Sequence, residues 1–247
     1  MQQKQYYTEV LDSIPFHMMV ELMKRVLPAP VALGVAGFFR LKHVLGFPSK
    51  PQYAFGDVST QSRLPKHEIP GRVLARWAGK MERLHDLGFQ ECAFAIPDMI
   101  GAKESAGALF IDEPGSTLAT LEYHRMVGAQ GIEEQTPLEF NSFLIDGSEI
   151  MTAMLAEEHL VLANAFPLDF VDQEYLPNTD SIRKVYAHHC ERIRQQSERV
   201  IPRELAASEQ LACNQRRFEA MLSKGVIRKI SPREVASVRE KQLPLHD

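Results

Sequence analysis

Hydrophobic residues recur with two different spacings in the middle of the chain. From Pro70 to Leu87 they return every three or four positions, the period of a helix with one buried face, at Val73, Trp77, Met81 and Leu84. From Phe89 to Met154 they alternate with other residues in short segments, which is the period of a β-strand. The pattern therefore predicts a helix followed by a run of strands.

Turn residues separate the predicted strands. Asp112-Glu113-Pro114-Gly115 and Asp146-Gly147 both suit tight chain reversals, because aspartate and proline favour turns and glycine accepts a positive φ. Short strands joined by such turns pair antiparallel with their neighbours in the chain. We therefore predict an α+β fold in which an antiparallel β-meander of four to six strands packs against helices.

Prolines and helical spacing divide the rest of the chain into sections. Residues 1–47 read as a helical N-terminal section, with two helices separated by Pro28 and Pro30. Residues 48–69 are rich in proline and polar residues and read as an extended connector, and residues 70–247 form the predicted α+β domain. The spacing of apolar residues in the C-terminal part of that domain predicts further helices. The segment His159–Ala163 fits either a strand or a helix end.

Composition limits the classes of function. The 247 residues are 45% hydrophobic, which is enough for a sizeable core, and a formal net charge of -4 makes nucleic-acid binding an unlikely role. Arginines gather in the C-terminal helices, but interleaved glutamates account for them as salt bridges along each helix. The three cysteines, Cys92, Cys190 and Cys213, indicate no disulfide framework, so we expect a cytoplasmic protein.

Familiar catalytic and cofactor motifs are missing from the sequence. His188 and His189 are adjacent, so on a regular helix they point about 100° apart and do not serve one metal ion. We interpret His189 as a packing residue and His188 as a surface residue. The cysteines lie in strand or helix interiors, and Gly34-Val35-Ala36-Gly37 lacks the context of a nucleotide-binding loop. We expect no metal, no cofactor and no catalytic residue that a motif would identify.

Polar residues interrupt the predicted meander and supply the main functional candidate. If one face of the sheet packs on the helix 73–87, the polar residues should lie on the other face, where a hollow would form a small-molecule site. These residues are Thr120, Glu122, His124, Glu139, Asn141 and Ser142. The leading hypothesis is a non-enzymatic ligand-binding or sensory module for a small polar or amphipathic molecule or a lipid, held near Glu122, His124, Glu139 and Asn141. A solvated sheet face is the plainer alternative, and a hydrolase or transferase using His124 with Glu122 or Glu139 is another.

The N-terminal section is rich in methionine and phenylalanine and supports a different hypothesis. Its longest apolar stretch, Val26–Phe39, contains two prolines and is too short to cross a bilayer. Basic residues surround this section, at Lys24, Arg25, Arg40 and Lys42. The section fits internal packing, a homo-oligomer or scaffold interface, or at most peripheral membrane contact.

One ordering of elements resembles a known group. A helix ending Leu87-Gly88-Phe89, a meander closing with the segment Phe143–Thr152, and later helices with histidines near His188 together resemble a loose group of uncharacterised bacterial proteins. The resemblance covers roughly residues 77–225. It implies the fold and carries no catalytic residues to this chain.

Overall fold

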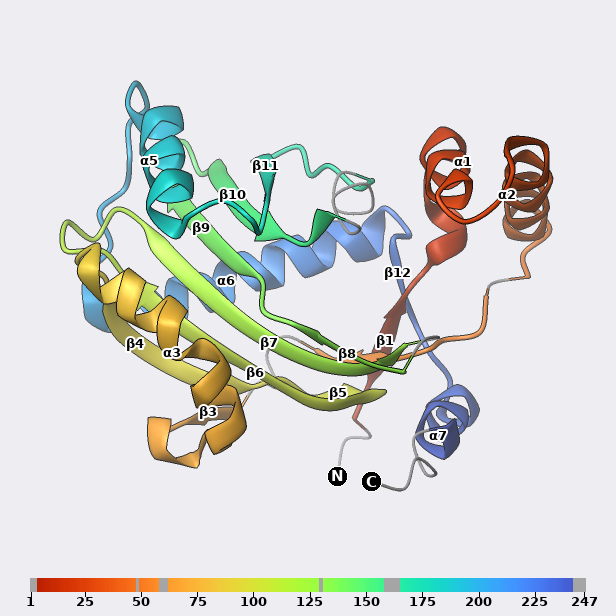
Figure 1. Ribbon diagram of the computed structural model, residues 1–247, viewed down its shortest axis with the longest axis horizontal. Helices are drawn as coiled ribbons and strands as arrows, with labels where there is room; N and C mark the ends of the chain where they lie inside the picture. Colours follow the sequence, from red (N-terminus) through yellow and green to blue (C-terminus); the bar gives the residue numbers. More distant parts are fainter. Residues whose placement is uncertain (1–3, 48, 58–61, 129–130, 158–164, 242–247) are drawn as a thin grey trace.

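The computed structural model describes residues 4–47, 49–57, 62–128, 131–157 and 165–241 (Figure 1). The α-helices are α1 (Phe16–Lys24), α2 (Ala29–Val44), α3 (Gly71–Asp86), α5 (Ile182–Ile193), α6 (Arg203–Ser223) and α7 (Pro232–Lys241). The strands are β1 (Tyr6–Glu9), β2 (Ala54–Gly56), β3 (Ser62–Leu64), β4 (Gln90–Ile96), β5 (Met99–Ile100), β6 (Ala102–Ile111), β7 (Leu118–Gly128), β8 (Gly131–Gln135), β9 (Leu138–Phe143), β10 (Glu149–Leu155), β11 (Val171–Pro177) and β12 (Ile227–Lys229). Short 3-10 turns occupy Leu11–Ser13 and Lys66–Glu68.

The larger sheet confirms the predicted α+β fold and its antiparallel meander. Its strand order is β11-β10-β9-β7-β6-β4-β3, with β8 paired to β7. Strands β4, β6, β7, β9 and β10 lie beside their neighbours and run antiparallel, whereas β11 pairs parallel with β10. The chain reverses at Asp146-Gly147 as expected, but the turn is longer than two residues. Among the described residues only glycines have a positive φ, so Gly147 adopts it at 86° and Asp146 does not; the Leu144 N–H donates to the Ser148 carbonyl at 2.9 Å.

Helices α3 and α5 cover one face of this sheet (Figure 1). The apolar side of α3 is buried as its spacing predicts, at Val73, Trp77, Met81 and Leu84. Alternate residues of the strands meet it, among them Leu121 and Phe140, which are fully buried. The Trp77 Nε1–H donates to the Glu122 carbonyl at 3.1 Å, so the indole both fills the core and fixes α3 to β7.

Helix α6 crosses the opposite face of the larger sheet (Figure 1). Near its N-terminal end the contact is apolar, because Ala206 and Cys213 pack against Leu109, Leu118 and other side chains of this face. Further along the same strands the residues become polar. The sheet therefore has one dry face under α3 and α5 and one mixed face under α6.

The smaller sheet joins segments that are far apart in the sequence. Its order is β12-β1-β2-β5, so β1 from section 1–47 and β2 from section 48–69 lie beside two strands of section 70–247. The segment 48–69 also contributes β3 to the edge of the larger sheet. Residue 48 and residues 58–61 of that segment, and the stretch His159–Ala163 whose type was left open, lie outside the described residues. The division into three sections stays a prediction.

The helical N-terminal section is present as a hairpin of α1 and α2. Ala32 and Ala36 of α2 are buried, and Ala36 packs with Met19, Val20 and Ile14. Among the residues that the structure describes, no helix combines the length and the apolar character needed to cross a membrane.

Candidate functional site

A cavity of about 340 Å³ lies between the mixed face of the larger sheet, helix α6 and the edge where β2 meets β5. Its floor is formed by small and apolar residues of β4 and β6, including Ala93, Ala95, Gly107 and Leu109. The volume falls within the range of small-molecule sites, about 300–1,000 Å³. Small side chains at the floor are what leave this space open.

Three cavity-lining residues carry a buried oxygen without a hydrogen-bond partner in the described part of the chain. One of these oxygens, Asp98 Oδ2, is ion-paired with Lys4 Nζ at 2.6 Å, which leaves two without any partner. They are Thr120 Oγ1 on β7 and Gln210 Oε1 on α6. The other end of the Gln210 amide is engaged, because Nε2 donates to Asn214 Oδ1 at 3.0 Å. An unsatisfied buried polar atom costs about 1–3 kcal/mol, so a ligand group that pairs with these atoms would remove that cost. Because Gln210 Oε1 only accepts, the matching group is a hydrogen-bond donor.

Glu122 and His124 also line the cavity, on the same face of β7 as Thr120. His124 Nε2 lies 3.0 Å from Glu122 Oε2, and His124 Nδ1 lies 2.8 Å from Ser105 Oγ on β6. Of the Glu122 side chain 47% stays accessible, against 18% for His124. Because Glu122 lines the cavity, this accessible carboxylate offers a polar contact for a bound molecule.

Each of these two side chains favours the charged form of the other. Burial lowers the pKa of His124, but the hydrogen bond and the charge of Glu122 outweigh it and raise the pKa above 6.5. Burial raises the pKa of Glu122, but the hydrogen bond and charge of His124, with the charge of Arg217, bring it below 4.5. When His124 is protonated, both of its ring nitrogens donate, so Ser105 Oγ accepts and is not activated as a nucleophile.

The order Ser105, His124, Glu122 is the order of a catalytic triad, so an enzyme is the natural alternative. Ser105 is only 8% exposed, and it is not among the described residues that line the cavity. A serine nucleophile must reach the substrate. The arrangement therefore favours binding at Glu122 over reaction at Ser105.

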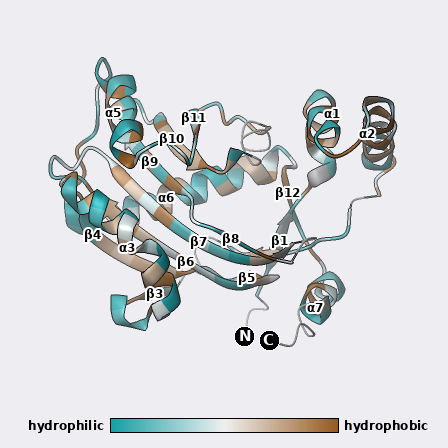
Figure 2. Cartoon of the chain, viewed as in Figure 1, coloured by the Kyte–Doolittle hydropathy of each residue, from teal (hydrophilic) through white to brown (hydrophobic). Residues whose placement is uncertain are grey.

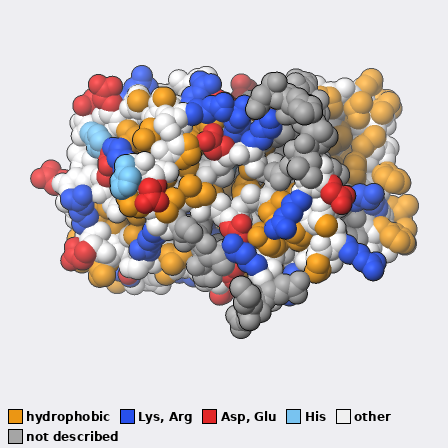
Figure 3. All heavy atoms as spheres, turned by 90° about the horizontal axis from the view of Figure 1, so that it is seen from below, with side chains coloured by type: hydrophobic (Ala, Val, Ile, Leu, Met, Phe, Trp, Pro, Cys, Tyr) orange, Lys and Arg blue, Asp and Glu red, His pale blue; other side chains and the backbone are white. Residues whose placement is uncertain are grey.

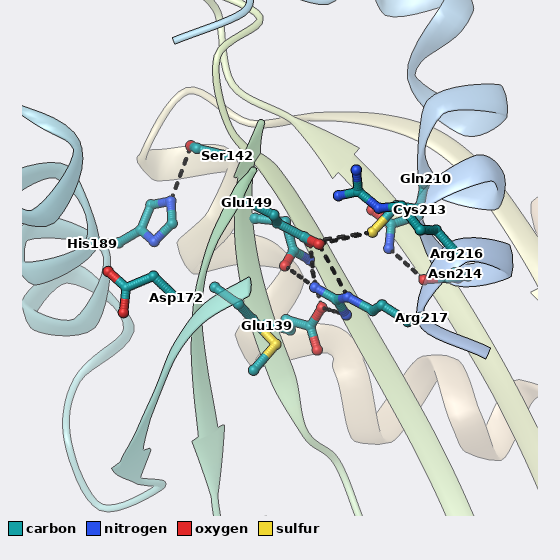
Figure 4. Close-up of polar contacts among 12 residues, drawn as sticks. Glu139, Ser142, Glu149, Asp172, His189, Gln210, Cys213, Asn214, Arg216 and Arg217 are labelled. Carbon is teal, nitrogen blue, oxygen red and sulfur yellow. Dashed lines mark hydrogen bonds and ion pairs between the residues drawn. The ribbon is translucent and has the colours of Figure 1, made fainter. Parts of the chain in front are cut away.

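Arg217 of α6 forms a second polar cluster beside the cavity (Figure 4). Its guanidinium donates to Glu139 Oε1 at 2.7 Å, to Asn141 Oδ1 at 2.7 Å and to both carboxylate oxygens of Glu149. Glu149 is fully buried at the start of β10, and the Cys213 thiol lies 3.1 Å from its Oε2. Burial raises the pKa of Cys213 despite the nearby Arg217, so the thiol stays protonated.

The structure thus divides the four predicted site residues into two pairs. The sheet brings all four to one face, since Thr120 pairs with Glu139 and Leu118 pairs with Asn141 across β7 and β9. Glu122 and His124 line the cavity. Glu139 and Asn141 instead bind Arg217 and are not among the described residues that line it. Their role as ligand-binding residues stays a prediction.

The polar residues that α6 contributes were not predicted from the sequence. Gln210, Asn214 and Arg217 are spaced four and three residues apart, which places them on one side of the helix. Arg217 was interpreted as part of a salt-bridged helix surface, whereas its partners lie on β9 and β10. The spacing of these polar residues along one stripe was the available signal.

The remaining histidine candidates have structural partners. His189 is fully buried, and its Nε2 lies 3.1 Å from Ser142 Oγ (Figure 4). Its Nδ1 lies 2.9 Å from Thr152 Oγ1. Burial, with the nearby charges, lowers the pKa of His189 to about 3, so the ring is neutral. His188 instead lies nearer the surface, 2.9 Å from Glu174. Within the described ranges, no group of three or more histidine, cysteine, aspartate or glutamate side chains is placed to hold a metal ion.

Comparison with known proteins adds no relative: no family model, no curated protein and no solved structure matches this chain. The resemblance to uncharacterised bacterial proteins stays a prediction. The class that the fold defines is an α+β protein with a largely antiparallel sheet and a cavity on one face of it.

Proposed function

We propose that this protein is a small-ligand-binding module whose cavity holds an amphipathic molecule. The observation that carries the proposal is that two residues lining one cavity, Thr120 on the sheet and Gln210 on α6, each hold a buried oxygen without a hydrogen-bond partner among the described residues. A cavity with apolar walls and a few convergent polar groups is the usual form of a small-molecule site.

The walls indicate the chemistry of the ligand. Ala93, Ala95 and Leu109 favour an apolar body. Gln210 Oε1 and the accessible carboxylate of Glu122 favour a head group that donates hydrogen bonds, such as a hydroxyl, an amide or an amine. A fully apolar molecule would leave both unpartnered oxygens unsatisfied and would bind more weakly.

A thermal-shift screen tests the proposal with pairs of molecules that differ only in the head group. The panel consists of alkyl and aryl alcohols, amides and amines, each compared with its parent hydrocarbon. We expect at least one donor-bearing series to raise the unfolding temperature more than its hydrocarbon does. If no compound of the panel shifts the transition, the cavity does not bind this class and the proposal is wrong.

Thr120→Val gives the screen a sharper readout. Removing the unpartnered hydroxyl should stabilise the ligand-free protein by about 1 kcal/mol, because a buried unsatisfied group disappears. The same change should weaken donor-bearing ligands by about three- to tenfold, the value of one hydrogen bond. The stability of the ligand-free protein therefore rises while the affinity for donor-bearing ligands falls. Chemical unfolding measures the first change and titration calorimetry the second.

Thr117→Val is the matched control for this variant. Thr117 is also buried on the chain leading into β7, but its hydroxyl already lies 3.2 Å from Ser142 Oγ. Its loss should lower stability and leave ligand affinity unchanged. Equal ligand affinity of Thr120→Val and the unmodified protein would contradict the proposed role of the Thr120 hydroxyl.

A further inference from the structure

The α1–α2 hairpin exposes an unusually large apolar surface. Nine of the fourteen large hydrophobic side chains exposed among the described residues lie between residues 16 and 47. Figure 2 shows α2 as mostly hydrophobic, and Figure 3 shows hydrophobic side chains gathered at the end of the molecule where the hairpin lies. We call this surface the hairpin patch; its members are Phe16, Val26, Val31, Leu33, Phe38, Leu41, Val44, Leu45 and Phe47. Scattered exposed apolar residues are normal, but a concentration of this kind marks a contact surface.

The inner side of the hairpin does not use these residues. Helix α2 packs inward through the small side chains Ala32 and Ala36, while Phe38 remains 63% exposed and Leu41 57% exposed. The larger apolar side chains of α2 thus face away from the protein. A helix that packs only against the core has its large apolar side chains on the inner side, which is the opposite of what α2 shows.

Charge distinguishes between the surfaces that could cover the hairpin patch. Across the hairpin, residues 16–47, the sequence has four lysines and arginines and one acidic residue, Glu21, which pairs with Lys24 at 2.7 Å, in a chain of net charge -4. Arg40 and Lys42 flank Leu41 in the sequence, so they leave the helix about 100° to either side of it. A second copy of the chain would bring two such basic surfaces together, and like charges repel. An anionic surface would instead attract the basic side chains on both sides of Leu41.

We infer that the hairpin patch docks the protein on the surface of an anionic lipid bilayer. The 16 residues of α2 extend for about 24 Å, a length that suits a helix lying in the plane of the interface. Phe38, Leu41 and Leu45 enter the boundary between head groups and acyl chains, and Arg40 and Lys42 reach the phosphates along either edge.

Flotation of the full chain with vesicles tests the inference. We expect binding to vesicles of phosphatidylcholine mixed with phosphatidylglycerol, weaker binding to phosphatidylcholine alone, and loss of the difference at high salt. Leu41→Glu should lower the partition coefficient by about tenfold or more, since it places a charge in the apolar stripe. Leu41 is exposed, so circular dichroism and the unfolding temperature should stay unchanged.

Ile145→Glu is the control, because it adds the same charge at a site outside the hairpin patch. Ile145 is 72% exposed in the turn between β9 and β10. It should bind vesicles as the unmodified chain does. Absence of binding to anionic vesicles, or equal binding by Leu41→Glu, overturns the inference. A dimer in solution that Leu41→Glu converts to a monomer would assign the patch to a second copy of the chain, and would overturn it too.

Discussion

Replacing Arg217 by methionine should destabilise the protein by about 3–5 kcal/mol, the usual cost of removing one partner of a buried ion pair. Arg217 is the cation that faces Glu139 and Glu149, and its side chain is 15% exposed while that of Glu149 is fully buried. Burial alone would lower the pKa of Arg217, but the two carboxylates raise it well above its ordinary value. Methionine fills similar space, so the loss is electrostatic rather than a loss of packing. Chemical denaturation with urea measures it.

Two comparisons separate the charge from its geometry. Arg217→Lys keeps one positive charge but cannot reproduce the planar fork that reaches Glu139, Asn141 and Glu149 together. Its stability should therefore lie between that of the unmodified protein and that of Arg217→Met. Arg194→Met removes an arginine whose side chain is 70% exposed and paired with Glu191 on the same helix surface. That control should cost no more than about 1 kcal/mol. Similar losses for Arg217→Met and Arg194→Met would show that the buried cluster does not hold α6 to the sheet.

Filling the cavity from Gly107 should abolish most ligand binding. Gly107 lies on the cavity wall in β6, and a Cβ added there would meet no atom within 4 Å. Its φ lies outside the left-handed region, so larger residues fit the backbone. Gly107→Leu places its side chain where the ligand's apolar body would lie, and we expect affinity to fall by about 10- to 100-fold. Titration calorimetry with a ligand found in the screen measures the change.

A graded series and a second glycine make this result specific. Gly107→Ala should weaken binding less than Gly107→Leu, because steric exclusion grows with the volume of the side chain. Gly79 on the exposed side of α3 also has open space around an added Cβ, so Gly79→Leu should leave affinity unchanged. Tight binding by a folded Gly107→Leu variant would place the ligand elsewhere on the protein.

The β-meander could be predicted from the sequence because it is determined by patterns within short segments and by the turns between them. Alternation along each strand fixes which residues share a face, and turns such as Asp146-Gly147 fix antiparallel neighbours. This is why Glu122, His124, Glu139 and Asn141 lie on one face as expected. The same expectation was wrong for Ser142, which lies on the other face and contacts His189 of α5, because neighbouring residues of a strand point to opposite sides. The burial of α3 through Trp77 follows from helical spacing in the same way.

Contacts between segments far apart in the chain could not be predicted from the sequence. Nothing in the local pattern pairs β1 with β12 or makes β11 run parallel to β10. Nor does it show that Arg217, rather than a ligand, satisfies Glu139 and Asn141, because that depends on where α6 crosses the sheet. The polar face was predictable from period and composition, but its division between an internal ion cluster and an open cavity required the tertiary structure.

The most direct test follows the histidine imidazole signals by NMR while a donor-bearing ligand is added, with the His124 signal identified by its absence in His124→Gln. We expect the His124 signal to move, since this ring lines the cavity beside Glu122, while the signal of buried His189 on the other face of the sheet stays in place. A ligand that stabilises the protein yet leaves the His124 signal in place would contradict binding in this cavity.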